Sequence, residues 1–260
     1  MLKRTGRLLL FLTLCVVMVL SINAVAFAQD YPPEPLIDPD DTGIKVKSSV
    51  TVNSPGGARE ATEEHMKRWA DAEKPNATRA LSSSVTQGTL AYWEPLSPFY
   101  YYGQELGMSC GPASVRMALK YLTGTTYSES TIRTGCNFDP VTGTYLSDLV
   151  DYTNDEQSDN WYIARYEQTQ ATMNSNLYDG ITYWDAPPII GVEESINAGW
   201  PYDIGGHFLA VYSVMSDKSA YALCDPWAGY IDDDDNRWYD KSDDDLYSAY
   251  DAADNLGYMY

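Results

Sequence analysis

Apolar residues recur at helical spacing in the middle of the chain. They occupy positions i, i+3, i+4 and i+7 of one stretch, and this spacing predicts a helix over residues 110–122. The residues are Val115, Ala118, Leu119 and Leu122. Pro112 suits a first helical turn and Gly124 suits a helix end, so both boundaries agree with the spacing.

The remaining pattern predicts helices first and strands later. Further helices are expected at 128–134, 144–154, 170–178 and 243–252. Strands are expected at 161–168, 188–193, 207–215, 220–225, 237–240 and 257–260. Strands 207–215 and 220–225 should form a hairpin through the polar turn 216–219. This order favours an α+β fold over a wound α/β sheet.

The first 28 residues have the layout of a secretory signal peptide. Basic residues precede an apolar run over 8–20, and the small residues Ala26 and Ala28 follow it. We expect cleavage after Ala28 and a secreted protein, extracellular or associated with the cell surface. A membrane anchor is the alternative, but the uninterrupted apolar run is short for a bilayer span.

Residues 29–91 separate this signal from a domain at 92–260. Residues 29–58 are rich in proline and are expected to lack structure, 59–74 predict a helix, and 75–90 read as a loop. The helix is either a surface or linker helix or part of an inhibitory pro-segment lying across a cleft. Dense aromatic residues and continuous elements mark the domain from about residue 92 onward.

The net charge limits the possible partners of the chain, and the number of cysteines suggests a free thiol. The chain carries a net charge of −20, and the signal segment holds three basic residues and no acidic one, so the remainder is still more acidic. Such a surface repels nucleic acid and anionic lipid, and we expect neither nucleic-acid partners nor membrane binding after cleavage. Three cysteines follow the signal, at Cys110, Cys136 and Cys224. Either Cys136 pairs with Cys224 and Cys110 is free, or none pairs.

Cys110 stands where a thiol would be activated. It begins the predicted helix 110–122, and a helix N-terminus carries partial positive charge and free N–H groups that stabilise a thiolate. Gly111 and Pro112 keep bulk away from the sulfur. A buried structural cysteine is the alternative.

Three further residues complete a candidate hydrolytic site. His207 is the only histidine of the predicted domain, and it opens an apolar strand. Asp225 follows on the next strand of the hairpin, where a carboxylate could orient the imidazole. Gln104 lies six residues before Cys110, and its amide could donate to an oxyanion together with the Cys110 N–H.

These motifs together resemble a known family. Gln104 with Cys110-Gly111-Pro112-Ala113-Ser114, then Gly206-His207-Phe208, then Asp225-Pro226-Trp227, resemble papain-like cysteine peptidases of the bacteriocin-processing, double-glycine branch. The resemblance covers about residues 98–260. It implies a papain-like fold, in which a helical half carries the nucleophile at a helix N-terminus and an antiparallel sheet carries the histidine and aspartate. It also implies that Cys110 attacks a carbonyl, His207 moves the proton, Asp225 orients His207 and Gln104 helps to form the oxyanion hole.

Two features outside the motif set need separate interpretation. Gly56-Gly57 suggests self-processing, since the namesake enzymes cut after two glycines, but Ser54 stands where an apolar residue is expected. We therefore interpret the pair as a flexible linker. The acidic run 232–235 lacks the spaced ligands of an EF-hand and reads as a solvated loop rather than a calcium site.

The sequence thus predicts a secreted cysteine peptidase that acts on a peptide or protein substrate and needs no cofactor or metal. A catalytically silent binding module on the same fold is the first alternative. Transfer of the acyl group to an amine instead of water is the second.

Overall fold

The computed structural model describes residues 31–39, 53–74, 91–158 and 161–260. The predicted signal peptide, its cleavage site after Ala28 and the loop 75–90 lie outside the described residues. Among the helices of the described ranges, none is both long and apolar enough to cross a membrane.

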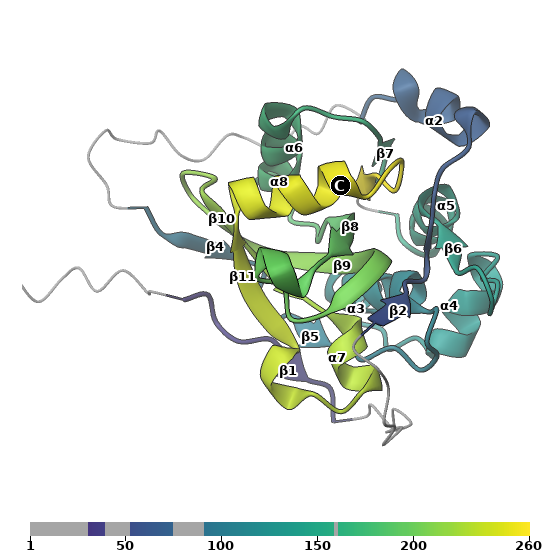
Figure 1. Ribbon diagram of the computed structural model, residues 1–260, viewed down its shortest axis with the longest axis horizontal. Helices are drawn as coiled ribbons and strands as arrows, with labels where there is room; N and C mark the ends of the chain where they lie inside the picture. The colour runs from purple at the N-terminus through teal and green to yellow at the C-terminus, as the bar shows by residue number, and fades with distance from the viewer. Residues whose placement is uncertain (1–30, 40–52, 75–90, 159–160) are drawn as a thin grey trace, which may run out of the picture.

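An antiparallel sheet forms the centre of the molecule (Figure 1). Its strands follow the order β11-β10-β9-β8-β12-β7, and β2 and β4 also pair with β9. Their bounds are β2 Asn53–Pro55, β4 Trp93–Pro95, β7 Ala164–Arg165, β8 Ile189–Glu194, β9 Asp203–Met215, β10 Ala220–Cys224, β11 Trp238–Ser242 and β12 Tyr258–Met259. Two small sheets join β1 (Leu36–Ile37) to β5 (Tyr100–Tyr101) and β3 (Ala58–Arg59) to β6 (Thr144–Tyr145).

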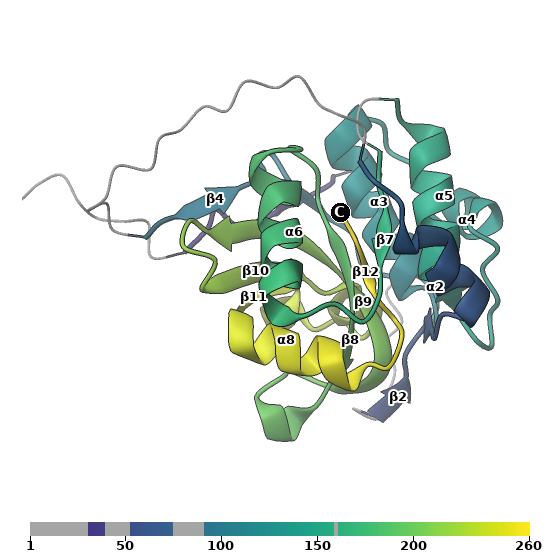
Figure 2. The ribbon, with the colours of Figure 1, turned by 90° about the horizontal axis from the view of Figure 1, so that it is seen from above.

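Helices cover both faces of the sheet. Their bounds are α2 Glu63–Ala70, α3 Cys110–Thr123, α4 Glu129–Gly135, α5 Leu146–Glu156, α6 Gln170–Thr182, α7 Pro226–Tyr230 and α8 Asp243–Ala252. Figures 1 and 2 show α3, α4 and α5 gathered on one side and α6 and α8 on the other. Alternation along β9 explains the two layers, because Phe208 packs in the cluster with α3 and α5 while Leu209 packs in the cluster with α6 and α8. The expected α+β fold is confirmed.

The helix that carries Cys110 forms where its apolar spacing predicts. α3 begins at Cys110 and ends at Gly124, which takes a left-handed φ of 70° and donates its N–H to the Lys120 carbonyl. The hairpin of β9 and β10 is also confirmed, with Tyr221 opposite Val214 and Cys224 opposite Ala210. This hairpin brings His207 and Asp225 to the same end of the sheet.

Several predicted boundaries differ from the structure. The predicted helix 59–74 is shorter, because Thr62 caps α2 at one end and Asp71 ends it at the other. The predicted strand 161–168 is reduced to β7, Ala164–Arg165, opposite β12, and Ile163 beside it exchanges main-chain hydrogen bonds with Tyr260. In the predicted helix 144–154, Thr144 and Tyr145 pair with β3 instead, and the helix starts at Leu146.

Parts of the segment 29–58, expected to lack structure, are paired with the domain. β1 runs parallel to β5, and the Leu36 N–H donates to the Phe99 carbonyl at 2.7 Å. β2 runs parallel to the start of β9. Gly56 and Gly57 are buried, so the interpretation of this pair as a flexible linker is wrong.

The side-chain packing beneath α3 yields a stability prediction. Leu149 of α5 is fully buried, and its Cδ1 lies 2.9 Å from the point where a Cβ on Gly111 would stand. Leu149→Ala should lower the free energy of unfolding by about 2–5 kcal/mol, because it leaves a cavity against the start of α3. Urea denaturation measures this loss. Val141→Ala, at a side chain 77% exposed, is the control and should stay within about 0.5 kcal/mol of the wild type.

Candidate active site

Cys110 is the first residue of α3 and has no exposed surface. Its sulfur accepts a hydrogen bond from the Phe208 main-chain N–H at 3.4 Å, which joins the helix to β9. Ser114, one turn further along α3, donates its hydroxyl to the Phe208 carbonyl at 3.1 Å. An added Cβ on Gly111 would meet Leu149 and Phe208 at 2.9 and 3.2 Å, so glycine permits this close approach. The thiol is therefore fixed against the strand that carries His207.

His207 lies on β9 and is 1% exposed. Its Nε2 is 2.8 Å from Oδ1 of Asp225, and Asp225 has no exposed surface. With Nε2 engaged by the carboxylate, Nδ1 is the ring nitrogen left for Cys110. The structure thus brings three of the predicted site residues together in the order thiol, imidazole, carboxylate.

The charges of this group determine its protonation. Burial alone would lower the pKa of His207, but the neighbouring Asp225 carboxylate and the hydrogen bonds to Asp225 and Cys110 outweigh it. Together they hold the pKa of His207 well above its usual value. A protonated imidazole between a carboxylate and a thiol is the arrangement that favours an ion pair with the sulfur.

Asp225 is held by more than the imidazole. It is the N-cap of α7, and its Oδ1 accepts from the Trp227 N–H at 2.8 Å. The Tyr101 hydroxyl donates to its main-chain carbonyl at 2.9 Å. The Asp-Pro pair at the end of β10 therefore starts a helix and aims a carboxylate at His207 at the same time.

Gln104 lies next to this group, but its side chain is turned to the loop. Its amide nitrogen donates to the Leu106 carbonyl at 2.8 Å, and its main-chain N–H donates to the Pro226 carbonyl at 2.9 Å. The side chain is 3% exposed. A carboxamide has two N–H groups, and Leu106 takes one of them.

Two residues that the motifs did not single out extend the polar chain. The Tyr239 hydroxyl lies 3.0 Å from Oδ2 of Asp225 and 3.1 Å from Oε1 of Glu194. Burial, followed by the charge of Asp225, raises the pKa of Glu194 well above its usual value. The Tyr239 hydroxyl thus lies within hydrogen-bond distance of both carboxyl groups and connects them. Ile190, Val192 and Glu194 occupy every second position along β8, so the three side chains lie on the same face of the strand. This alternation is the signal in the sequence that Glu194 faces inward.

Glu194, His207 and Asp225 also form the group of side chains that could offer three metal ligands, with ligand atoms within 4.8 Å of one another. His207 and Asp225 already satisfy each other through the 2.8 Å contact. In the acidic run, Oδ2 of Asp233 accepts from Tyr202 and Asn236, and Asp234 pairs with Arg237. These carboxylates thus bind donors from the protein itself.

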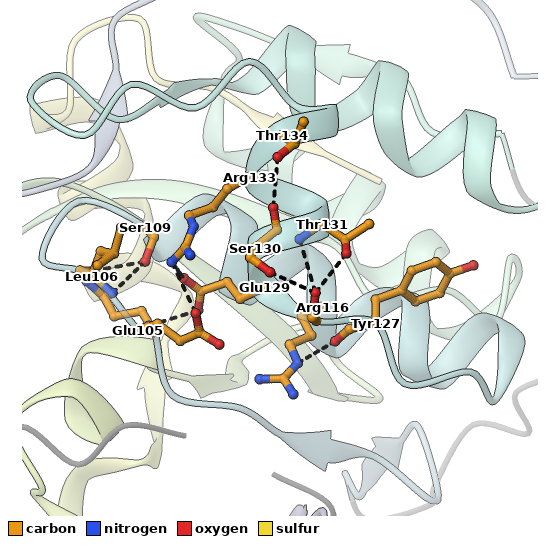
Figure 3. A network of polar contacts seen from close by, with 12 residues as sticks. Glu105, Leu106, Ser109, Arg116, Tyr127, Glu129, Ser130, Thr131, Arg133 and Thr134 are labelled. Atoms are coloured by element: carbon orange, nitrogen blue, oxygen red, sulfur yellow. Dashed lines mark hydrogen bonds and ion pairs between the residues drawn. The ribbon is translucent and has the colours of Figure 1, made fainter. Parts of the chain in front are cut away.

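The loop that leads into Cys110 is clamped by a buried acidic residue (Figure 3). Glu129 of α4 accepts the Glu105 N–H at 2.9 Å and pairs with Arg133 at 3.0 Å, and Arg133 also reaches Glu105 at 3.2 Å. The Ser109 hydroxyl exchanges hydrogen bonds with the main chain of Leu106. The network fixes the backbone between Gln104 and Cys110.

The other two thiols have a different environment. Cys110, Cys136 and Cys224 are all free and buried, so the alternative without a disulfide holds for the described cysteines. Burial raises the pKa of Cys136 to about 12 and that of Cys224 well above its usual value. Neither thiol is prepared to react at neutral pH.

Comparison with known proteins gives the following. No family model matches the chain, and no curated protein matches it. Among solved structures, the chain is similar to the peptidase domain of Streptococcus ComA, a bi-functional ABC transporter involved in a quorum-sensing pathway. That match has 18% identity and a TM-score of 0.42, and it covers 61% of this chain and 94% of that one. A Bacillus anthracis protein described as C39-like peptidase matches at 12% identity and a TM-score of 0.46, with 64% and 96% covered.

The loop clamp makes stability depend on pH. Burial raises the pKa of Glu129 from 4.5 to about 7, against the lowering effect of hydrogen bonds from Ser109 and Glu105. The folded protein therefore binds more protons than the unfolded chain between pH 4.5 and about 7, and this contribution to stability falls as pH rises through that window.

Glu129→Gln removes the titration and keeps an acceptor oxygen. Between pH 4.5 and 7, its free energy of unfolding relative to wild type should rise by on the order of 3 kcal/mol. Urea denaturation at both pH values measures the difference. Glu60→Gln, at an exposed carboxylate, is the control. An identical pH dependence in wild type and Glu129→Gln would contradict the clamp.

Proposed function

We propose that the protein is a cysteine peptidase that hydrolyses amide bonds of a peptide or protein substrate through Cys110, His207 and Asp225. The observation that carries the proposal is the buried chain of contacts from the Cys110 sulfur through the His207 ring to the Asp225 carboxylate, with Nε2 and Oδ1 2.8 Å apart. A purely structural cysteine needs no imidazole held in this orientation.

The chemistry follows from these positions. The Cys110 thiolate attacks the substrate carbonyl carbon, and the carbonyl electrons move to the oxygen. The Cys110 N–H, which as the first residue of α3 has no partner within the helix, and the second N–H of the Gln104 amide are the proposed donors to that oxygen. His207 gives its proton to the leaving amine as the C–N bond breaks, which leaves a thioester on Cys110. Water then attacks the thioester while His207 takes one of its protons, and the C–S bond breaks to release a carboxylic acid and to restore the Cys110 thiolate beside the protonated His207.

Export is part of the proposal. The basic, apolar and small residues of positions 1–28 support secretion with cleavage after Ala28. The acidic surface supports a peptide partner rather than a nucleic acid or an anionic membrane. N-terminal sequencing of protein collected from the culture medium tests this, because Gln29 should be the first residue.

The three free thiols provide an internal comparison for the mechanism. At pH 7, iodoacetamide should label Cys110 about tenfold or more faster than Cys136 and Cys224, since burial without a cationic partner keeps those two protonated. His207→Ala should remove the advantage. Mass spectrometry of tryptic peptides gives the three rates in one sample.

Peptide cleavage completes the test. Fragments released from a library of short peptides should disappear in Cys110→Ser and persist in the matched variant Cys136→Ser. Equal and slow labelling of all three thiols, together with cleavage that survives in Cys110→Ser, would refute the mechanism.

Tyr239 should act as a positioning residue. Tyr239→Phe removes the hydroxyl between Glu194 and Asp225, so the carboxylate loses a donor. We expect kcat to fall about tenfold with KM unchanged, and the pH profile of kcat/KM to shift, because Asp225 then holds the imidazole differently. Tyr247→Phe on α8, whose hydroxyl lies by Asp251, is the matched control and should keep the wild-type profile. A fall in stability with an unchanged pH profile would mean a structural role alone.

A further inference from the structure

The strand that carries His207 begins with residues that β10 does not cover. β9 pairs with β8 on one side down to Ile204, and with β10 on the other side only from Ala210 onward. On the side of β10, the main-chain groups of residues 203–205, which lie shortly before the imidazole, are therefore left for a strand other than β10. Such an edge accepts an extended peptide as an added strand.

The chain fills this edge with its own N-terminal segment. β2 lies parallel to β9, with Asn53 opposite Asp203 and Pro55 opposite Gly205. The Gly56 N–H continues the pairing and donates to the Gly205 carbonyl at 2.6 Å. Figure 1 shows β2 beside β9 and close to α3 and α4.

The next residues pass between the two halves of the active site. An added Cβ on Gly56 would stand 1.8 Å from the Gly206 oxygen, and one on Gly57 would stand 1.9 Å from the Met108 oxygen. Gly206 immediately precedes His207, and Met108 lies two residues before Cys110. Backbone on both sides leaves no room for a side chain, so two consecutive glycines are required here.

The segment also contacts the helical half of the molecule, which consists of α3, α4 and α5 together with β6. The Thr144 N–H donates to the Gly57 carbonyl at 2.9 Å, and β3 then pairs in parallel with β6. The Arg59 guanidinium donates to the Tyr145 hydroxyl at 2.7 Å and lies over its ring. Residues 53–59 thus connect the sheet to the helical half across the site, while Cys110 and His207 are 0% and 1% exposed.

We propose that residues 53–59 are a built-in occupant of the substrate cleft that lowers the basal activity of the peptidase, an inference that rests on the proposed function. The cleft surface that binds this segment consists of the edge of β9 at residues 203–205, Met108 and β6. Its ligand is an extended peptide segment with glycine at two successive positions. Substrate can reach Cys110 only after this segment leaves.

The hydrogen bonds indicate an inhibitor rather than a substrate. Hydrolysis after Gly57 would require its carbonyl oxygen to lie at the Cys110 N–H and the Gln104 amide. Among the hydrogen bonds of the described residues, this carbonyl accepts from Thr144, and the Gln104 amide donates to Leu106. The Gly57–Ala58 bond is held away from the donors that would activate it.

α2 anchors the occupant from its C-terminal side. Arg68 makes two hydrogen bonds of 2.7 and 2.6 Å to Asp151 of α5, and Arg165 of β7 donates to the Trp69 carbonyl at 2.8 Å. The Nζ of Lys74 lies 4.4 and 4.6 Å from the ring centres of Trp184 and Tyr260. These contacts keep the segment beside the cleft, which raises its effective concentration there.

The test compares Cys110 alkylation in the full chain and in the double variant Gly56→Ala/Gly57→Ala. The added methyl groups cannot fit against the Gly206 and Met108 backbone, so the segment should leave and Cys110 should react about tenfold or more faster than in wild type. Gly107→Ala is the matched control, because its Cβ would meet nothing closer than 3.7 Å and should leave the rate unchanged. Unchanged slow labelling of Cys136 and Cys224 reports that the variant is folded.

A peptide added in trans provides the second measurement. The synthetic peptide NSPGGAREA, residues 53–61, should slow Cys110 alkylation in the double variant, whereas NSPAAAREA should not. Equal Cys110 rates in wild type and double variant, or equal effects of the two peptides, would overturn the occupant. N-terminal sequencing that finds Ala58 as the first residue of the purified wild type would also overturn it, because the segment would then be a substrate.

The outcomes for this inference and for the proposed function are separable. Faster Cys110 alkylation in the double variant without cleavage of any library peptide would support the occupant and count against the peptidase. Equal rates of Cys110 alkylation and of peptide cleavage in both proteins would support the peptidase and remove the occupant.

Discussion

The contact between His207 and Asp225 is the interaction on which the site depends. Two ionisable groups are placed in the interior, where either charge alone would be costly, and the 2.8 Å contact compensates both. This contact forms because the β9–β10 hairpin brings the ends of two strands together and because α7 begins at Asp225. The Phe208 N–H then holds the Cys110 sulfur against the same strand. One pair of side chains therefore links the sheet, a short helix and the helical half.

The three thiols differ in the charged groups that surround them. All three described cysteines are buried, so burial does not distinguish them. Cys136 and Cys224 have apolar surroundings that raise the pKa of each thiol. Cys110 has an imidazole and a helix N-terminus beside it instead. Exposure would have been a misleading guide to reactivity here, whereas the neighbouring charges are informative.

The predictable parts of the fold are those governed by local pattern. The bounds of α3 and α8 and the β9–β10 hairpin follow from apolar spacing, capping residues and turn composition, and the structure agrees. Cys110, His207 and Asp225 were recognisable because the helix start, the strand start and the Asp-Pro turn are each local signals. Glu194 and Tyr239 were missed, because their meeting with Asp225 depends on the register of three strands. The role of Gly56-Gly57 was also out of reach, since parallel pairing with residues 150 positions away leaves no local pattern.

The position of β12 affects when the complete fold can form. Tyr258 pairs with Ile190 on one side and with Arg165 on the other, so this two-residue strand lies between β8 and β7 and joins them in one sheet. A chain emerging from the ribosome carries Cys110 and its helix long before residue 258 is made, and until then β7 has no partner to hold it in the sheet. Completion of the framework is therefore a late event in synthesis, and a product truncated before residue 258 would keep the pairing of β8, β9, β10 and β11 but lose the link between β8 and β7.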